Sequence, residues 1–198
     1  AGAAGIAADA TGDGFDNLAA ALNFSDALLE KYFAAADLVI ERLYQFPPKG
    51  PKPKPGERPP LLAKLVQPGG PRATLEHLLR RAYRRPVEGK EVARLLALHE
   101  KAVKAGATAD DALKPVLKAV LASPHFLLRV ERDKAKEEGA YRVGDHELAV
   151  RLSYFLWGTM PDAELFALAD KGELGNAGVY DAQVKRMLAD PKARALTA

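Results

Sequence analysis

The sequence predicts an all-α fold, a multi-helix bundle or a stacked helical array that is interrupted by a proline-rich linker. Three observations support this prediction. Aliphatic residues recur three or four positions apart along most of the 198-residue chain, and Ser, Thr, Asp or Asn precedes many of these stretches. Glycine or proline follows most of them. Runs of β-branched residues and hairpin turns are scarce.

The first helix is expected at residues 25–45, within an N-terminal helical segment that spans residues 1–46. Leu28, Leu29 and Tyr32 begin a run of apolar residues at helical spacing. The hydroxyl of Ser25 can cap the start of this helix, because it can accept a hydrogen bond from a backbone N–H of the first turn.

Residues 47–60 hold seven of the 14 prolines in the chain. Proline removes a backbone donor and clashes with the preceding helical turn, so this segment is expected to be an extended, solvated linker. A proline-rich ligand for an aromatic groove is the alternative interpretation. Residues 61–198 are then a helical domain, which we expect to be truncated at its C-terminal end.

A series of helices is predicted within residues 61–198. One stops at Pro86 and the next at Gly106. Thr108 begins a capping box for a third helix, which Pro115 should bend or shorten. The helices that follow are expected to start at residues of capping type, namely Ser123, Asp145, Thr159 with Asp162, Asn176 and Asp190.

Residues 151–162 concentrate aromatic side chains, including the single tryptophan. In a helix over residues 146–157, Leu148, Leu152 and Phe155 fall along one broad face. We therefore expect Phe155 and Trp157 to be buried in the core, and Gly158 to reverse the chain. A platform for an aromatic ligand is the alternative.

Composition excludes several classes of protein. The net charge is only +3, so nucleic acid is not an expected partner. No apolar stretch is long enough for a transmembrane segment, and the first residues lack the pattern of a signal peptide. The chain has no cysteine, so it can attach no c-type haem covalently.

Several long stretches, taken in order, carry a resemblance: "GDGFDNLAAALNFSDALLEKYF", "LLRRAYRRPVEGKEVARLLAL", "VLKAVLASPHFLLRVE", "HELAVRLSYFLWGTMPDAELFALADKGEL" and "DAQVKRMLADPKARAL". They are similar to successive motifs of the planctomycete cytochrome C proteins, large exported proteins built from serial domains of unknown function. The resemblance implies an exported, periplasmic or cell-envelope location and a chain that continues past Ala198. It implies haem c in the parent protein, attached outside this region. After the Arg-Arg-Pro-Val motif, members of the family usually have Thr or Ser with acidic residues. This chain has Glu88 and Gly89 at those positions instead.

Asp9, Thr11 and Asp13 occupy the first, third and fifth positions of a calcium loop of the EF-hand type. Ala20 stands at the twelfth position, where a bidentate Glu is required. A polar turn that caps the next helix accounts for the same residues.

The four histidines are scattered and lack metal-ligand spacing. His125 and His146 are the candidate cofactor ligands, because either could approach a haem held elsewhere in the parent assembly. A structural hydrogen bond to a backbone carbonyl is the alternative role.

Arg80, Arg81, Arg84 and Arg85 form the densest basic cluster and flank Tyr83. On a helix they spread over a broad surface, and arginine is well suited to pairing with carboxylates between helices. We expect this structural role, with partner docking and nucleic-acid binding as alternatives.

The sequence contains no catalytic constellation that we recognise. Two functional hypotheses remain. The chain is a helical scaffold and interaction module of an exported, haem-linked multidomain protein, or it is part of an oxidoreductase whose active site another haem-bearing domain completes. The expected partners are other domains or subunits of the parent assembly.

Overall fold

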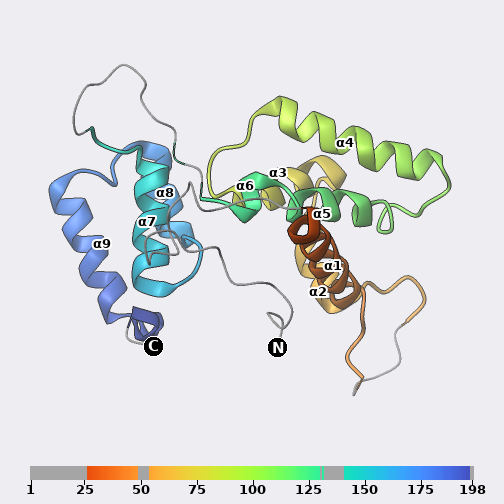
Figure 1. Cartoon of the computed structure of the whole chain (residues 1–198), viewed down its shortest axis with the longest axis horizontal. Coiled ribbons are helices and arrows are strands. Elements are labelled where there is room, and N and C mark those ends of the chain that lie inside the picture. Colours follow the sequence, from red (N-terminus) through yellow and green to blue (C-terminus); the bar gives the residue numbers. More distant parts are fainter. Residues whose placement is uncertain (1–25, 49–53, 130, 132–140, 197–198) are drawn as a thin grey trace. The chain divides into compact units, whose positions relative to one another are not determined.

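The computed structural model of the chain describes residues 26–48, 54–129, 131 and 141–196 (Figure 1). These residues form helices and loops, and no strand occurs among them. The all-α prediction is therefore confirmed. The chain divides into two compact units. Unit 1 contains the residues up to Leu78 and Gly89–Leu127, and unit 2 contains Leu79–Glu88 and the residues from Leu128 onwards.

Unit 1 is built from helices of 4 to 18 residues around an apolar core. Its helices are α1 (Asp26–Leu43), α2 (Pro60–Leu65), the first part of α3 (Gly70–Tyr83), α4 (Gly89–Lys104), α5 (Leu113–Leu121) and α6 (Pro124–Leu127). α1 packs against α2 and α5, and α5 packs against α4 and α6. One cluster of buried apolar side chains in this unit contains Ile40, Leu62, Leu113 and Leu117.

The proline-rich segment connects helices of the same compact unit. Its described residues are non-helical up to Pro59, and α2 begins at Pro60, which is inside the predicted linker. Arg58 at the end of the segment donates to the carboxylate of Asp110 at 2.7 Å. α1 packs against elements that lie beyond the linker because its buried side chain Ile40 completes their core. Residues 26–45 are therefore not a physically separate body.

α5 begins later than the sequence predicted. Thr108 Oγ1 accepts a hydrogen bond from the backbone N–H of Asp111 at 3.0 Å, but this bond closes a turn before the helix, whose N-cap is Ala112 without a side-chain cap. The helix itself begins only at Leu113. Pro115 therefore lies in the first turn, where its missing N–H removes no intrahelical hydrogen bond.

Unit 2 closes around a tryptophan. It contains α7 (Asp145–Trp157), α8 (Ala163–Lys171), α9 (Ala177–Ala189) and the 3-10 helix η2 (Pro191–Leu196), and α7 contacts all three of the others. Trp157 is only 3% exposed, and its indole Nε1 donates to the carbonyl of Met187 at 2.9 Å. The cluster of buried side chains around it contains Ala149, Leu152, Leu156, Trp157, Leu165, Ala169, Leu174 and Met187.

The expectation that Phe155 is buried was wrong, because its side chain is 69% exposed. The buried face of α7 is centred on Ala149 and Ser153, both fully buried, with Leu152 and Leu156 beside them. At roughly 100° per residue, Phe155 points about 130° away from the centre of that face. The small residues mark the face that lies closest to neighbouring helices, and a search for large apolar residues overlooks them.

Two further predicted caps are displaced. The N-cap of α7 is Gly144, whose N–H donates to Glu147 at 2.8 Å, while the carboxylate of Asp145 accepts from the backbone of Gly175. The N-cap of α8 is Asp162 alone, which accepts from the N–H of Leu165 at 2.9 Å. Thr159 lies too far before this helix to cap it. Ser25 lies outside the described residues.

Candidate functional site

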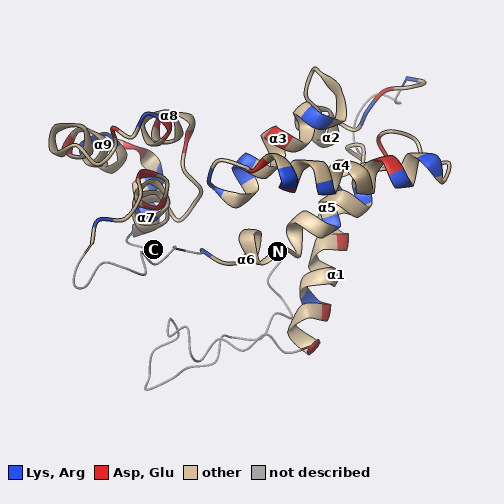
Figure 2. Cartoon of the chain, turned by 90° about the horizontal axis from the view of Figure 1, so that it is seen from above, with Lys and Arg blue, Asp and Glu red and all other residues tan. Residues whose placement is uncertain are grey.

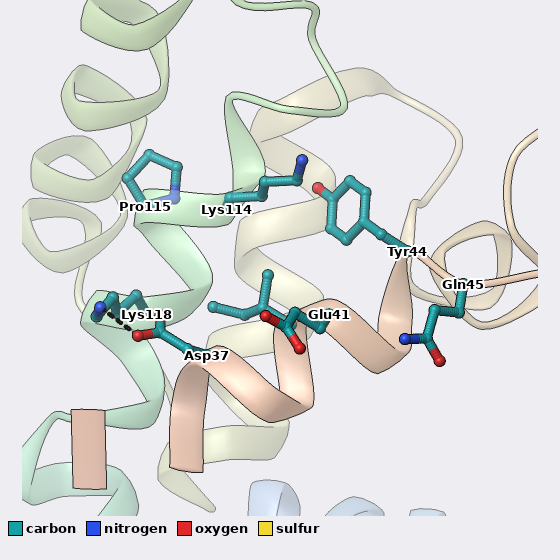
Figure 3. Close-up of a pocket in the computed structure, with 8 residues that line it drawn as sticks. Asp37, Glu41, Tyr44, Gln45, Lys114, Pro115 and Lys118 are labelled. Carbon is teal, nitrogen blue, oxygen red and sulfur yellow. Dashed lines mark hydrogen bonds and ion pairs between the residues drawn. The ribbon is translucent and has the colours of Figure 1, made fainter. Parts of the chain in front are cut away.

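A cavity of about 500 Å³ lies between α1 and α5 within unit 1 (Figure 3). α1 and the two residues that follow it supply five of the lining side chains, and α5 supplies three. The lining residues are Asp37, Ile40, Glu41, Tyr44, Gln45, Lys114, Pro115 and Lys118. The helices position them because residues four apart share one face of a helix.

Carboxylates from α1 and ammonium groups from α5 line the cavity. Asp37 and Glu41 are four residues apart on α1, as are Lys114 and Lys118 on α5. Lys118 Nζ lies 2.7 Å from Asp37 Oδ2 at one end of the cavity (Figure 3). At the other end the ammonium of Lys114 lies 4.5 Å from the centre of the Tyr44 ring.

Tyr44 contributes its ring to the cavity as a neutral phenol. Its hydroxyl donates to the backbone carbonyl of Asp110. Burial, together with the nearby carboxylates of Asp111 and Asp110, raises the pKa of Tyr44 to about 12. Lys114 also pairs with Asp111 at 2.7 Å, and this contact, together with the hydroxyl of Thr108, holds the pKa of that carboxyl below its usual value.

The arginine cluster lies at the end of α3 and belongs to unit 2. Arg80 Nη2 lies 2.5 Å from the carboxylate of Asp170 on α8, and its guanidinium stands 5.2 Å from the centre of the Phe166 ring. This is the pairing of arginine with a carboxylate of another helix that the sequence suggested. The contact joins α3 to α8.

The other three arginines make different contacts. Arg84 is 8% exposed, donates to the carbonyl of Leu128 at 2.9 Å, and adopts a left-handed φ of 57° directly after α3 ends. Its guanidinium also lies 5.9 Å from the Tyr154 ring. Arg81 reaches the sulfur of Met160 at 3.7 Å, and Arg85 donates to the carbonyl of Pro86 at 2.9 Å. The four side chains therefore do not converge on one point.

The two candidate histidines lie in different units. His125 is exposed on the short helix α6, where its backbone N–H donates to Ser123 Oγ. His146 stands on the first turn of α7, and its Nε2 lies 3.4 Å from Asp170 Oδ1. Its Nδ1 is buried and has no hydrogen-bond partner among the described residues. Burial lowers the pKa of His146 against the opposing effect of Asp170, and so favours the neutral ring.

His146 does not fit the role of an axial haem ligand. Its Nε2 faces a carboxylate that Arg80 also holds, and its other nitrogen is enclosed. The cavity described above lies between α1 and α5 and is lined by neither candidate histidine. Among the described residues no three His, Asp or Glu side chains are grouped so that they could hold a metal ion. Asp9, Thr11 and Asp13, the candidate calcium ligands, lie outside the described residues.

Sequence reasoning missed the residues of the α1–α5 cavity. The pairs Asp37 with Glu41 and Lys114 with Lys118 show the i,i+4 spacing that could have identified two charged faces. Nothing in the sequence shows that the two helices lie against each other, because 69 residues separate the end of α1 from the start of α5. The charges of both signs are spread over the helices rather than gathered on one of them (Figure 2).

Three segments of the chain match family models. Residues 2–45 match the proteins of unknown function DUF1587, residues 71–131 match DUF1595, and residues 143–198 match DUF1592. No curated protein and no solved structure matches the chain. None of the described helices combines the length and the apolar character that crossing a bilayer requires.

One boundary of the matched segments agrees with the division into two compact units, and another does not. The DUF1592 segment contains α7, α8, α9 and η2, which are the helices of unit 2. The end of α3 belongs to the DUF1595 segment by sequence and to unit 2 by its contacts. Each match covers less than half of the chain, so the chain is similar, segment by segment, to three successive domains of unknown function, DUF1587, DUF1595 and DUF1592.

Proposed function

We propose that the chain is a helical scaffold and interaction module of an exported, c-type-haem-linked multidomain protein. The observation that carries this proposal is the ion pair between Arg80 and Asp170. Arg80 lies in the DUF1595 segment and Asp170 in the DUF1592 segment, so the pair connects successive domains of the chain. A scaffold requires contacts of this kind, which hold one domain to the next.

The surroundings of the ion pair support the same role. The ring of Phe166 lies beneath the Arg80 guanidinium, and cation–π contact adds to the ion pair. Arg84, four residues further along, donates to the carbonyl of Leu128 and lies beside Tyr154. Both arginines thus make contacts within unit 2, which favours a structural role over the binding of nucleic acid.

The haem belongs, in this proposal, to parts of the parent protein other than this chain. Covalent attachment needs cysteine thiols, and the chain has none. Export to the periplasm or cell envelope is proposed on the same ground as the haem, namely the family that the sequence resembles. This chain contributes shape and contacts to the assembly rather than a redox centre.

Exchanging the two charges tests the scaffold in the full-length natural protein. Arg80→Glu and Asp170→Arg should each lower the free energy of unfolding by about 1 kcal/mol, because each places like charges together at a half-exposed site. The double variant should recover most of the loss. Thermal unfolding followed by circular dichroism measures all three variants, and the cycle isolates the pair from other effects of each substitution.

The visible spectrum of the same preparations supplies the control. We expect the absorption of the attached haem to be unchanged in all three variants. Single variants as stable as the natural protein would contradict the scaffold role of Arg80. A haem spectrum that changes with Arg80→Glu would place the cofactor against this region and favour the oxidoreductase hypothesis instead.

A further inference from the structure

The cavity between α1 and α5 retains one charge that the surrounding residues do not balance. We propose that it binds a cationic group carried on an apolar chain, such as the end of a lysine side chain or an alkylamine, with Glu41 as the counter-ion. The site lies in unit 1 and is separate from the Arg80–Asp170 pair in unit 2.

The ion pairs identify Glu41 as the unbalanced group. Lys118 is paired with Asp37 at 2.7 Å. Lys114 is paired with Asp111 at 2.7 Å and also lies over the ring of Tyr44. The carboxylate of Glu41 forms no ion pair or hydrogen bond with any residue that the structure describes, although its backbone carbonyl accepts from the N–H of Tyr44. Two carboxylates and two ammonium groups line the cavity, but Lys114 is paired with Asp111, which does not line it, so the charge of Glu41 has no paired cation among the lining residues.

The remaining walls are suited to an apolar body. Ile40 and Pro115 line the cavity from opposite helices, and the ring of Tyr44 closes one end (Figure 3). Gln45 already accepts a hydrogen bond from Arg42, so its carbonyl oxygen is occupied. A methylene chain that enters the cavity would leave water for this apolar surface, while its charged end could reach Glu41.

The other charges at the cavity explain why an anionic ligand is disfavoured. An anion would have to displace Asp37 or Asp111 from a lysine, or displace Lys114 from the ring of Tyr44. A cation meets a free carboxylate without breaking any contact. The phenol of Tyr44 stays neutral and offers only its ring, the negative face of which also favours cations.

Hexylammonium, hexanol and hexanoate are the probes that test the proposal on the whole chain. Their binding is measured by NMR titration, in which the signals of α1 and α5 report occupancy. Hexylammonium should bind about fivefold more tightly than hexanol, since an ion pair at a partly exposed site is worth up to about 1 kcal/mol. Hexanoate should bind more weakly than either.

Substitution at Glu41 sharpens the test. Glu41→Gln should weaken hexylammonium about fivefold and leave hexanol unchanged. Glu41→Lys should reverse the preference in favour of hexanoate. Glu30→Gln is the matched control, because Glu30 is an exposed carboxylate on the same helix that does not line the cavity. Circular dichroism of each variant establishes that the chain remains folded.

Titration with N-acetyl-lysine N-methylamide, which mimics a lysine within a protein chain, distinguishes a lysine side chain from a free amine as the source of the cation. Binding as tight as that of hexylammonium would identify the side chain of a protein partner, and weaker binding would identify a free amine. Equal affinities for hexylammonium and hexanol would overturn the proposal, as would an effect of Glu30→Gln as large as that of Glu41→Gln. Neither result would affect the scaffold role, which the stability of the Arg80 variants tests independently.

Discussion

Unit 1 leaves a cavity open between two of its helices, whereas unit 2 closes around a single large side chain. Lys118 and Asp37, which pair at the cavity, are each about half exposed. In unit 2 the ring of Trp157 lies near two cations, with Arg186 at 5.4 Å and Lys192 at 4.3 Å from its centre, and is itself almost fully buried.

The charged side chains of the two units differ in how far they are exposed to water, and therefore in what they contribute. In unit 2 the guanidinium of Arg186 forms two hydrogen bonds with Asp162, the N-cap of α8, and so joins α9 to the start of another helix. Both partners are about 30% exposed, so water weakens the pair only in part. In unit 1 the charges at the cavity remain accessible to solvent, where ion pairs contribute little to folding. Such charges are suited to recognition rather than to stability.

The largest expected effect concerns the core of unit 2. Trp157→Ala should lower the free energy of unfolding by about 3–5 kcal/mol, because it empties a buried site and leaves the carbonyl of Met187 without its donor. Urea denaturation followed by circular dichroism measures the loss. Phe155→Ala removes the exposed neighbour and should cost less than about 1 kcal/mol. Equal losses in the two variants would show that the core of unit 2 is centred elsewhere.

An intermediate effect is expected at the N-cap of α8. Asp162→Ala removes both the cap and the partner of Arg186, and should cost about 2 kcal/mol. Asp162→Asn keeps a side chain that caps well, so it should cost about half as much. Urea denaturation of the two variants at neutral pH measures the difference. A loss that is the same for Ala and Asn would mean that the ion pair, rather than the cap, stabilises this corner.

The same carboxylate predicts a pH dependence. Burial alone would raise the pKa of Asp162, but the hydrogen bonds from Arg186 and Leu165 outweigh burial and hold the pKa below its usual value. The unfolded chain has a pKa of about 3.9 at this residue. The contribution of Asp162 is therefore present above that pH and is lost as the pH falls through the lower pKa of the folded state. Asp162→Asn should lose less stability over this acidic range than the natural chain.

The smallest effect is expected at the cavity of unit 1. Asp37→Asn breaks the pair with Lys118 and should change the free energy of unfolding by about 0.5 kcal/mol or less, because both side chains are exposed to water. Thermal unfolding at low and high salt measures the change, which salt should diminish. A loss as large as that of Asp162→Ala would remove the distinction between the two units.

Much of the fold could be predicted because the signals are local. The end of α7 at Gly158 follows from the left-handed φ of 62° that glycine adopts readily, and the first turn of α5 accommodates Pro115 without losing a hydrogen bond. Phe155 could not be placed in the same way. A helical pattern with apolar residues on more than one side does not reveal which side the neighbouring helices cover.

The candidate site was less predictable than the fold. The sequence pointed to carboxylate pairing for the arginine cluster, and Arg80 pairs with Asp170 across 90 positions of the chain. The pattern could not identify that partner, because many exposed carboxylates have the same local environment. Glu41 was overlooked for a related reason. Its unpaired state depends on where the lysines of α5 lie, and on Asp111 and Asp37 having already paired with them.

The sequence by itself determined that this chain is helical, where most helices begin and end, and that no thiol is available for covalent haem attachment. These properties depend on short-range periodicity, on capping and on composition, which each segment carries alone. Only the tertiary structure decided that α1 packs on α5, that Trp157 rather than Phe155 enters the core, and that the Glu41 carboxylate has no ion-pair partner among the described residues. Each of these depends on contacts between distant segments, whose free energies exist only after the chain has folded.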